Sequence, residues 1–256
     1  MIDYEKLGNV AVITINRPDA RNAVNTDVAN GIEAAIDQLE ADDEVWVGIL
    51  TGAKTEKGYI FCAGADLKQM AVDPGGMQTA RGGFAGFVTR ERTKPVIAAV
   101  NGAAVAGGFE IVLACDLVVM STEARLVEPF VDRGILPDSG AIHLLTRIVG
   151  LRKAAELLML GEPVDAAECE RLGLVNRVVA TDDVDRVAED LAGRLAAGPT
   201  VMLALTKRLL AVSSESGRDR AFEQEAWAQE VVSRTADLQE GLSSFAERRK
   251  PHFRGF

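Results

Sequence analysis

Two glycine-rich stretches near the middle of the chain constrain its fold and chemistry more than any other feature. They are FCAGADLK at residues 61–68 and NGAAVAGGFE at residues 101–110. Each follows a strand-like apolar run and offers backbone with little side chain in the way. Two such turns can direct two peptide N–H groups at one oxygen atom, as enzymes do to stabilise a developing oxyanion. The second turn runs into the carboxylate of Glu110, so the sequence places an acid or base beside the predicted donor pair.

The composition fits a globular chain with a full hydrophobic core. It has 256 residues, 48% of them hydrophobic, which suits one large α/β domain or one domain with an appendage. A formal net charge of −10 argues against nucleic acid or an anionic membrane surface as a partner. Residues 1–5 show no signal segment, and no run approaches the roughly 18 apolar residues of a membrane span. We therefore expect a cytoplasmic protein.

The cysteine content points away from a disulfide framework or a zinc site. Cys62, Cys115 and Cys169 are too few and too scattered for either. We expect all three to be small packing groups in a reducing compartment, and we expect no metal.

Strand-like and helix-like patterns alternate along most of the chain. The predicted strands are residues 10–16, 45–51, 95–100, 117–121, 125–127 and 175–179. The predicted helices are residues 26–40 with Asn25 or Thr26 as the cap, 108–114, 140–149 closed by Gly150, and 151–160 closed by Gly161. Residues 71–87 are rich in glycine and small side chains, and we interpret them as a mobile flap or an irregular helix.

From Val184 onward the pattern is almost entirely helical, with breaks at residues 198–199 and 213–217. Val187, Leu191 and Leu195 form one apolar stripe. Helices with such stripes must pack on something, and a neighbouring subunit is the partner we expect. We divide the chain into a core of residues 1–195 and a helical oligomerisation region of residues 196–256.

Over essentially its whole length the chain resembles the crotonase, or enoyl-CoA hydratase/isomerase, superfamily. The resemblance rests on NRP at 16–18 with RNA at 21–23, FCAGADLK at 61–68, KPVIAAVNG at 94–102, AGGFE at 106–110, ACD at 114–116, LGLVN at 172–176 and FAERRKPHF at 245–253. It implies an α/β fold built as a spiral of ββα turns, assembled as a homotrimer or a dimer of trimers. It also implies acyl-CoA substrates, with coenzyme A entering as part of the substrate and no separate cofactor.

The resemblance implies that the N–H groups of Ala65 and Gly107 form an oxyanion hole around the thioester oxygen. These two donors would stabilise the negative charge that an enolate places on that oxygen. One such donor contributes a factor of about 10²–10³ in rate. The alternative is that the glycines of these turns only relieve crowding between stacked layers. We favour the functional interpretation because both turns occur together and in the order of the family.

Other residues of the same motifs are expected to line the substrate site. Ala63 and Leu67 flank the first turn, and Asp66 is included with them although we expect it mainly to fix that turn. The resemblance implies that Arg21 and Lys68 lie near the nucleotide part of coenzyme A. Arg248 and Lys250 are expected to reach the coenzyme of a neighbouring subunit, with a solvated chain end as the alternative.

The second acid of the family pattern is missing. Hydratases of the family hold a water molecule between two glutamates, and Glu110 occupies the first of these positions. The second position is Phe130, whose ring neither binds nor activates water. Glu128 lies two residues earlier, but Pro129 disturbs the strand geometry that would aim both side chains alike. We therefore expect Glu128 to be structural.

Asp138 offers another acid, in a Leu-Pro-Asp turn that some isomerases of the family share. Glu110 and Asp138 could pass a proton between C2 and a more distant carbon, with Phe130 keeping water out. Such a relay needs an acid whose pKa an apolar pocket raises toward neutral pH. Each acid also has a structural alternative, the helix dipole for Glu110 and N-capping of the next helix for Asp138.

These residues slightly favour double-bond isomerisation. The alternatives are hydration by Glu110 with Asp138 or Glu128, hydrolysis of an acyl-CoA, and non-catalytic binding of coenzyme A. A hydrolase would release free coenzyme A, and a binding protein would be indifferent to Glu110→Gln. The identity of the acyl group stays open.

Overall fold

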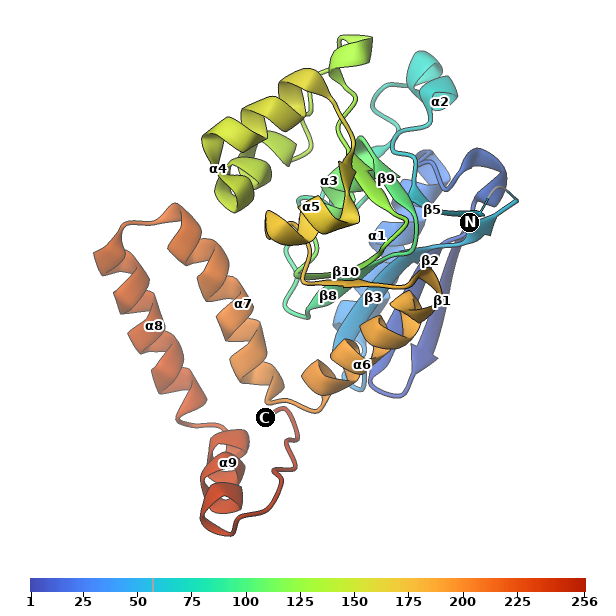
Figure 1. The fold of residues 1–256 in the computed structure, drawn as a ribbon. Helices are drawn as coiled ribbons and strands as arrows, with labels where there is room; N and C mark the ends of the chain where they lie inside the picture. The colour runs from blue at the N-terminus through green and yellow to red at the C-terminus, as the bar shows by residue number, and fades with distance from the viewer. Residues whose placement is uncertain (57) are drawn as a thin grey trace.

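The computed structural model describes residues 1–56 and 58–256, and its centre is a six-stranded sheet (Figure 1). The strand order is β1-β2-β3-β8-β10-β13, with β1 and β2 antiparallel and every other neighbouring pair parallel. The bounds are β1 Ile2–Leu7, β2 Val10–Ile15, β3 Val47–Gly52, β8 Val96–Val100, β10 Leu117–Ser121 and β13 Arg177–Val179. Every residue of β3 and β8 is buried, as continuous apolar runs predict for central parallel strands.

A second sheet stands beside the first, with the strand order β12-β11-β9-β5-β4. Its bounds are β4 Lys54–Thr55, β5 Gly58–Cys62, β9 Ala103–Val105, β11 Arg125–Val127 and β12 Val164–Asp165. Three times the chain adds a strand to the first sheet, then a strand to the second, and then a helix. The three turns are β3–β5–α2, β8–β9–α3 and β10–β11–α4, with helices α2 Leu67–Val72, α3 Gly107–Leu113 and α4 Ala141–Leu160. This confirms the expected α/β spiral of ββα turns.

Helices α1 (Thr26–Ala41) and α6 (Val184–Ala196) cover opposite faces of the first sheet. Asn25 caps α1 by accepting a hydrogen bond from the N–H of Val28, one of the two caps that the sequence allows. Side chains of α1 pack with Leu50 of β3, whereas α6 packs with Ile49. Because neighbouring strand residues point to opposite faces, the two helices enclose the sheet. The predicted stripe of α6 is partly buried, and Val184, Ala188, Ala192 and Ala196 lie deeper.

The helix pair after residue 140 is confirmed. Gly150 has the non-helical angles φ +78° and ψ 161° inside α4, so the segment is two helices joined at a kink. Gly161, at φ +69°, ends the second one. Asp165 then caps α5 (Ala166–Arg171) by accepting from the N–H of Glu168.

Residues 73–87 do not form a helix, so the irregular-helix interpretation is wrong. After α2 the chain makes turns and a small antiparallel pair, β6 (Gln78–Thr79) with β7 (Gly83–Phe84). Met77, Phe84 and Phe87 are buried in the main core, which anchors the segment. Gly82, Gly83 and Gly86 permit tight turns, which are incompatible with a continuous helix.

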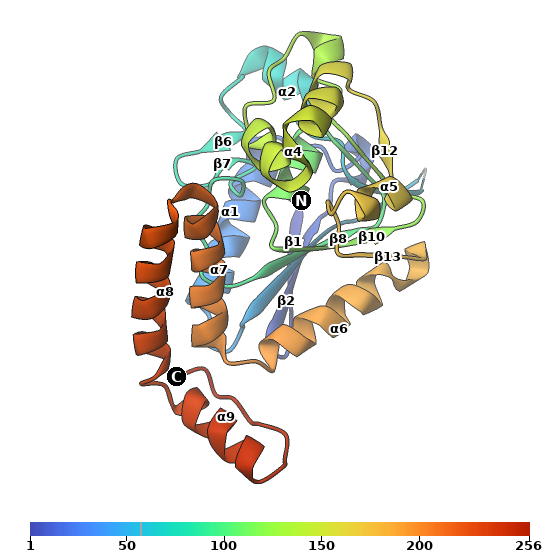
Figure 2. The ribbon, with the colours of Figure 1, turned by 60° about the vertical axis from the view of Figure 1, so that its left-hand side comes forward.

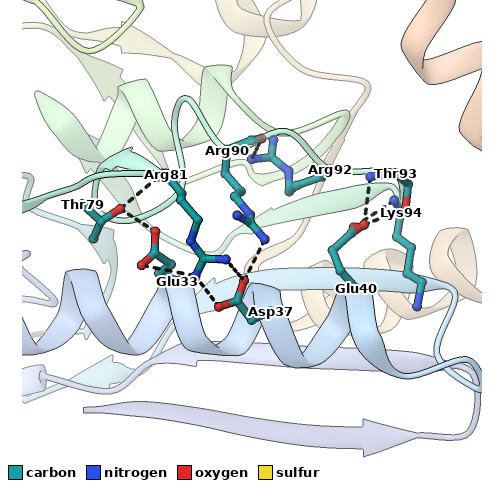
Figure 3. A network of polar contacts seen from close by, with 10 residues as sticks. Glu33, Asp37, Glu40, Thr79, Arg81, Arg90, Arg92, Thr93 and Lys94 are labelled. Atoms are coloured by element: carbon teal, nitrogen blue, oxygen red, sulfur yellow. Dashed lines mark hydrogen bonds and ion pairs between the residues drawn. The ribbon is translucent and has the colours of Figure 1, made fainter.

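Charged contacts from this segment and from Arg90, just after it, attach the chain to α1 (Figure 3). Arg81 and Arg90 both donate to the carboxylate of Asp37, at 3.0 and 2.7 Å. Thr79 donates to Glu33 at 2.7 Å. The segment is therefore held by apolar anchors on its inner side and by ion pairs on its outer side.

The last three helices project from the α/β body (Figures 1 and 2). They are α7 Thr200–Glu215, α8 Arg218–Val232 and α9 Ala236–Ala246. α7 and α8 run side by side as a hairpin, and α9 lies at the end of the molecule farthest from α2. Large apolar side chains stay exposed here, namely Leu210, Phe222, Trp227, Leu242 and Phe245. The division at residue 195 and the oligomeric role of this region stay predictions.

Within the described residues, no individual helix combines the length and the apolar composition of a membrane span. Only the segments Thr181–Ala196 and Thr200–Glu215 reach that length and composition together, and they are bent by 109° relative to each other.

Candidate active site

The two glycine-rich turns lie side by side because they follow neighbouring strands. β5 and β9 are parallel, with Cys62 opposite Ala104, so both strands end at the same edge. A Cβ added to Gly64 would lie 2.6 Å from the carbonyl oxygen of Val105 and 3.1 Å from the nitrogen of Gly107. A Cβ on Gly108 would collide with the carbonyl of Cys62. These glycines do relieve crowding, and in doing so they bring the two turns together.

The N–H groups of Ala65 and Gly107 are both unpaired within the described residues. In the described part of the chain, neither has a hydrogen-bond acceptor, whereas the neighbouring Gly64 carbonyl and Asp66 N–H bond to Val24. Gly107 is the first residue of α3, where an N–H has no partner within the helix. Ala106 precedes it at φ +51° and ψ −123°, a conformation that only the surrounding structure can enforce on a residue with a Cβ.

A cavity of about 540 Å³ opens beside these turns. The residues that the sequence assigns to substrate binding and that line it are Arg21, Ala63, Asp66, Leu67, Lys68 and Phe130, together with Ala65 of the predicted donor pair. Arg248 and Lys250 follow α9, at the end of the molecule opposite α2, and do not line this cavity. Their expected role requires a neighbouring subunit and stays a prediction.

The polar side of the cavity contains two arginines that the sequence argument missed, Arg17 and Arg133. Arg17 donates to Asp66 at 2.7 Å, and this contact holds the pKa of Asp66 below its usual range. Asp66 also caps α2 by accepting from the N–H of Lys68 at 2.9 Å. Asp66 thus fixes the turn, as expected, while the cations at Arg21, Lys68 and Arg133 face the same cavity. Arg17 belongs to the NRP motif quoted above, but no local sequence pattern indicates that it pairs with Asp66.

Glu110 lies in the first turn of α3 and is 2% exposed. Its Oε1 accepts a hydrogen bond of 2.9 Å from the N–H of Ser139. Burial raises the pKa of Glu110 to about 7, against the lowering effect of the N–H groups of Ser139 and Ala141, and the nearby charge of Asp138 adds to the rise. A carboxyl with such a pKa can both accept and return a proton near neutral pH.

Asp138 is exposed and close enough to Glu110 for its charge to act on that residue. Asp138 does not cap the following helix, because the N-cap position of α4 is Gly140 and the cap residue makes no side-chain hydrogen bond. The N-capping alternative for Asp138 is therefore wrong. The buried carboxylate of Glu110 satisfies donors at this helix end instead.

Glu128 is buried to 1% exposure, immediately before the cavity-lining residues Pro129 and Phe130. Among the described residues neither of its carboxyl oxygens has a hydrogen-bond partner. Burial raises the pKa of Glu128 well above its usual range, and repulsion by Glu110 raises it further. Sequence reasoning treats Glu128 as structural, yet the fold places it within electrostatic reach of the buried acid.

Phe84 connects the segment at residues 73–87 to the donor turn. A Cβ added to Gly107 would collide with the Phe84 ring, so this ring lies directly against the backbone of Gly107. The contact joins parts of the chain more than 20 residues apart, and no local pattern predicts it. Within the described residues, no group of three or more His, Cys, Asp or Glu side chains is arranged to hold a metal ion.

Comparison with known proteins agrees with this geometry. Residues 5–255 match the family model for enoyl-CoA hydratase/isomerase. The short-chain-enoyl-CoA hydratase of Clostridium acetobutylicum is 38% identical, covering 96% of this chain and 94% of that protein. The 1,2-epoxyphenylacetyl-CoA isomerase of Escherichia coli is 34% identical, covering 96% of this chain and 95% of that protein.

Solved structures show the same architecture. The crystal structure of an enoyl-CoA hydratase from Mycobacterium tuberculosis H37Rv superimposes with a TM-score of 0.93 at 35% identity, covering 100% of this chain and 99% of that one. The spiral core, the paired glycine turns and the match over nearly the whole length lead to one assignment: the chain belongs to the enoyl-CoA hydratase/isomerase (crotonase) family of enzymes.

Proposed function

We propose that this enzyme moves a carbon–carbon double bond within an acyl-CoA thioester. One observation carries the proposal: Phe130 lines the cavity beside the donor turns, while burial raises the pKa of the acid Glu110 to about 7. An apolar ring leaves no group there to hold a water molecule. Proton transfer between two carbon atoms needs no water, so the site suits isomerisation better than hydration.

The reaction is a proton transfer that conserves every atom of the substrate. Ionised Glu110 removes a proton from a carbon next to the double bond, and the electrons move onto the thioester oxygen. The N–H groups of Ala65 and Gly107 stabilise that oxygen as an enolate. When the enolate collapses, a proton returns to a different carbon from Glu110 itself or from Asp138. No electron is gained or lost, so coenzyme A need enter only as part of the substrate.

The cations of the cavity suit the other end of the substrate. Arg21, Lys68 and Arg133 can pair with the phosphate groups of coenzyme A, because guanidinium and ammonium groups both bind phosphate oxygens. We propose that Arg248 and Lys250 of a neighbouring subunit complete this site in a cytoplasmic homotrimer or dimer of trimers. The exposed apolar side chains of α7–α9 support such an assembly.

Hydration is the second candidate, and one observation favours it. The carboxyl of Glu128 lies within electrostatic reach of Glu110, so the site holds two buried acids despite Phe130. The names of the relatives support both reactions, since one is a short-chain-enoyl-CoA hydratase and another is a 1,2-epoxyphenylacetyl-CoA isomerase.

A side-by-side assay separates the candidates. The purified enzyme is given a 2-enoyl-CoA or the matching 3-enoyl-CoA, the products are separated, and a thiol reagent reports free coenzyme A. Conversion of the 3-enoyl to the 2-enoyl thioester without a 3-hydroxyacyl product supports isomerisation. Rapid formation of 3-hydroxyacyl-CoA would show that the reaction is hydration instead. Release of free coenzyme A would show that it is hydrolysis.

A further inference from the structure

Glu128 stands next to the predicted oxyanion hole through the register of two parallel strands. In β11 and β9, Leu126 lies opposite Ala104 and Val127 opposite Val105. The N–H of Ala106 donates to the carbonyl of Val127 at 2.8 Å, which continues this pairing past the end of β9. Glu128 therefore lies beside Ala106, one residue before Gly107.

The carboxyl of Glu128 has none of the partners that an ionised carboxylate requires. It is 1% exposed, and within the described residues neither oxygen accepts a hydrogen bond. Burial strongly disfavours a carboxylate that has no counter-charge or hydrogen-bond donor, so the neutral acid is favoured. Among residues 1–56 and 58–256, no lysine or arginine acts on its charge, and Glu110 is the one charged group that does.

Glu110 has the opposite surroundings. The N–H groups of Ser139 and Ala141 favour its ionised form, while Asp138 disfavours it. When two nearby acids have such different surroundings, they titrate as a pair, and the first proton leaves the better-solvated or better-bonded group. Here that group is Glu110, and the remaining proton stays on Glu128.

We propose that Glu128 is a positioning residue that holds one proton beside Glu110 and so makes Glu110 the ionised member of a two-carboxyl pair. This inference rests on the proposed function only for its effect on turnover. The neutral Glu128 keeps a second negative charge away from the enolate. Because Glu128 keeps its proton, proton return to the substrate is left to Glu110 or Asp138.

Infrared spectroscopy of the full chain tests the charge state without any turnover. The C=O stretch of a protonated carboxyl is followed against pH in the wild type, Glu128→Gln and Glu110→Gln. We expect a protonated-acid band that persists after Glu110 has ionised and that is missing in Glu128→Gln. In Glu110→Gln the band should titrate at least about one pH unit lower, since the neighbouring charge is gone.

Two results would overturn the inference. One is a wild-type spectrum that is the same as that of Glu128→Gln at every pH above the pKa of Glu110. This result would mean that Glu128 is already ionised there. The other is a Glu128 band that titrates at the same pH with and without the charge of Glu110. Both glutamines have nearly the same volume as glutamate, and Glu110→Gln reports on the intact Glu128 if Glu128→Gln folds poorly.

The dependence of kcat/KM on pH gives the functional readout. The wild type should lose activity at high pH as Glu128 ionises. Glu128→Gln should show the same fall in activity at low pH but no fall at high pH. An unchanged alkaline limb in Glu128→Gln would contradict the role of Glu128. If the enzyme shows the expected infrared bands but no isomerase activity, the proposed function is refuted. The inference that Glu128 is protonated would still stand.

Discussion

The backbone N–H of Ser139 donates a 2.9 Å hydrogen bond to Oε1 of Glu110, so the acid of α3 meets the N-terminus of α4. The peptide dipoles at this helix end favour a negative charge, while burial of the carboxyl opposes it. The two effects leave the pKa of Glu110 at about 7. The orientation of the acid and the start of α4 therefore depend on each other through the N–H groups of Ser139 and Ala141.

Replacing Glu110 by glutamine should lower kcat for isomerisation by about 10²–10⁴, the usual contribution of a general base. The glutamine oxygen can still accept from the N–H of Ser139, so the fold should be preserved. The measurement is kcat on the 3-enoyl-CoA, with the exposed Glu123→Gln as a matched control. Full activity of Glu110→Gln would remove this residue from the mechanism.

The pH dependence of the wild-type rate should report the same acid. Glu110 must be ionised to accept a proton, and its pKa is about 7. We therefore expect kcat/KM to rise about tenfold per pH unit below that value and to level off above it, until the alkaline loss that ionisation of Glu128 causes. A profile whose acidic limb lies at the ordinary pKa of a glutamate would show that another group is the base.

Burial of Glu110 should also make stability depend on pH. Its pKa is raised from 4.5 to about 7 on folding, so the folded state binds the proton more tightly. This contribution is fully present below pH 4.5 and is lost as pH rises through about 7, amounting to about 3 kcal/mol. Urea unfolding of the wild type and Glu110→Gln across this range checks it. Parallel curves would argue against a perturbed carboxyl.

Phe130→Glu should give the cavity an acid at the position where water would be held. We expect this variant to form 3-hydroxyacyl-CoA from a 2-enoyl-CoA, and we expect the control Phe130→Leu to form none. Chromatographic separation of the products gives the ratio of hydration to isomerisation. If Phe130→Leu hydrates as well as Phe130→Glu, the ring does not exclude water.

Gly107→Ala should lower kcat/KM by about 10²-fold, because the added Cβ meets the ring of Phe84 and displaces the donor turn. Phe84→Leu shortens that ring at a cost of about 1–2 kcal/mol of stability. The double variant should recover part of the lost rate. A double variant no faster than Gly107→Ala would show that the collision with Phe84 does not cause the defect.

Local patterns in the sequence predict the elements of the core well. Asn25 can begin a helix because its side chain accepts from a backbone N–H three residues later, and it does so here. Gly150 interrupts a helical pattern because its angles of φ +78° and ψ 161° cannot continue a helix. Both signals act within a few residues, so they need no knowledge of the rest of the fold.

The site depends on contacts that no local pattern contains. Glu128 is predicted to be structural from its neighbour Pro129, but the pairing of β11 with β9 brings it beside the turn before Glu110. The packing of Phe84 on Gly107 likewise joins distant segments. Family resemblance predicts that Ala65, Lys68 and Phe130 share one cavity, and all three line it, because the motifs record which strand ends meet. The resemblance says nothing of these two contacts.

Phe84 is anchored by a different part of the chain from the donor turns, so the two can change separately. The donor turns belong to the parallel strands, whereas the wall against Gly107 belongs to a segment attached through its own anchors and through ion pairs on α1. Insertions or exchanges within residues 73–83 can therefore alter the packing of Phe84 on Gly107 while β5 and β9 stay in register. On the proposed mechanism, acyl preference and enolate chemistry can then diverge independently in evolution.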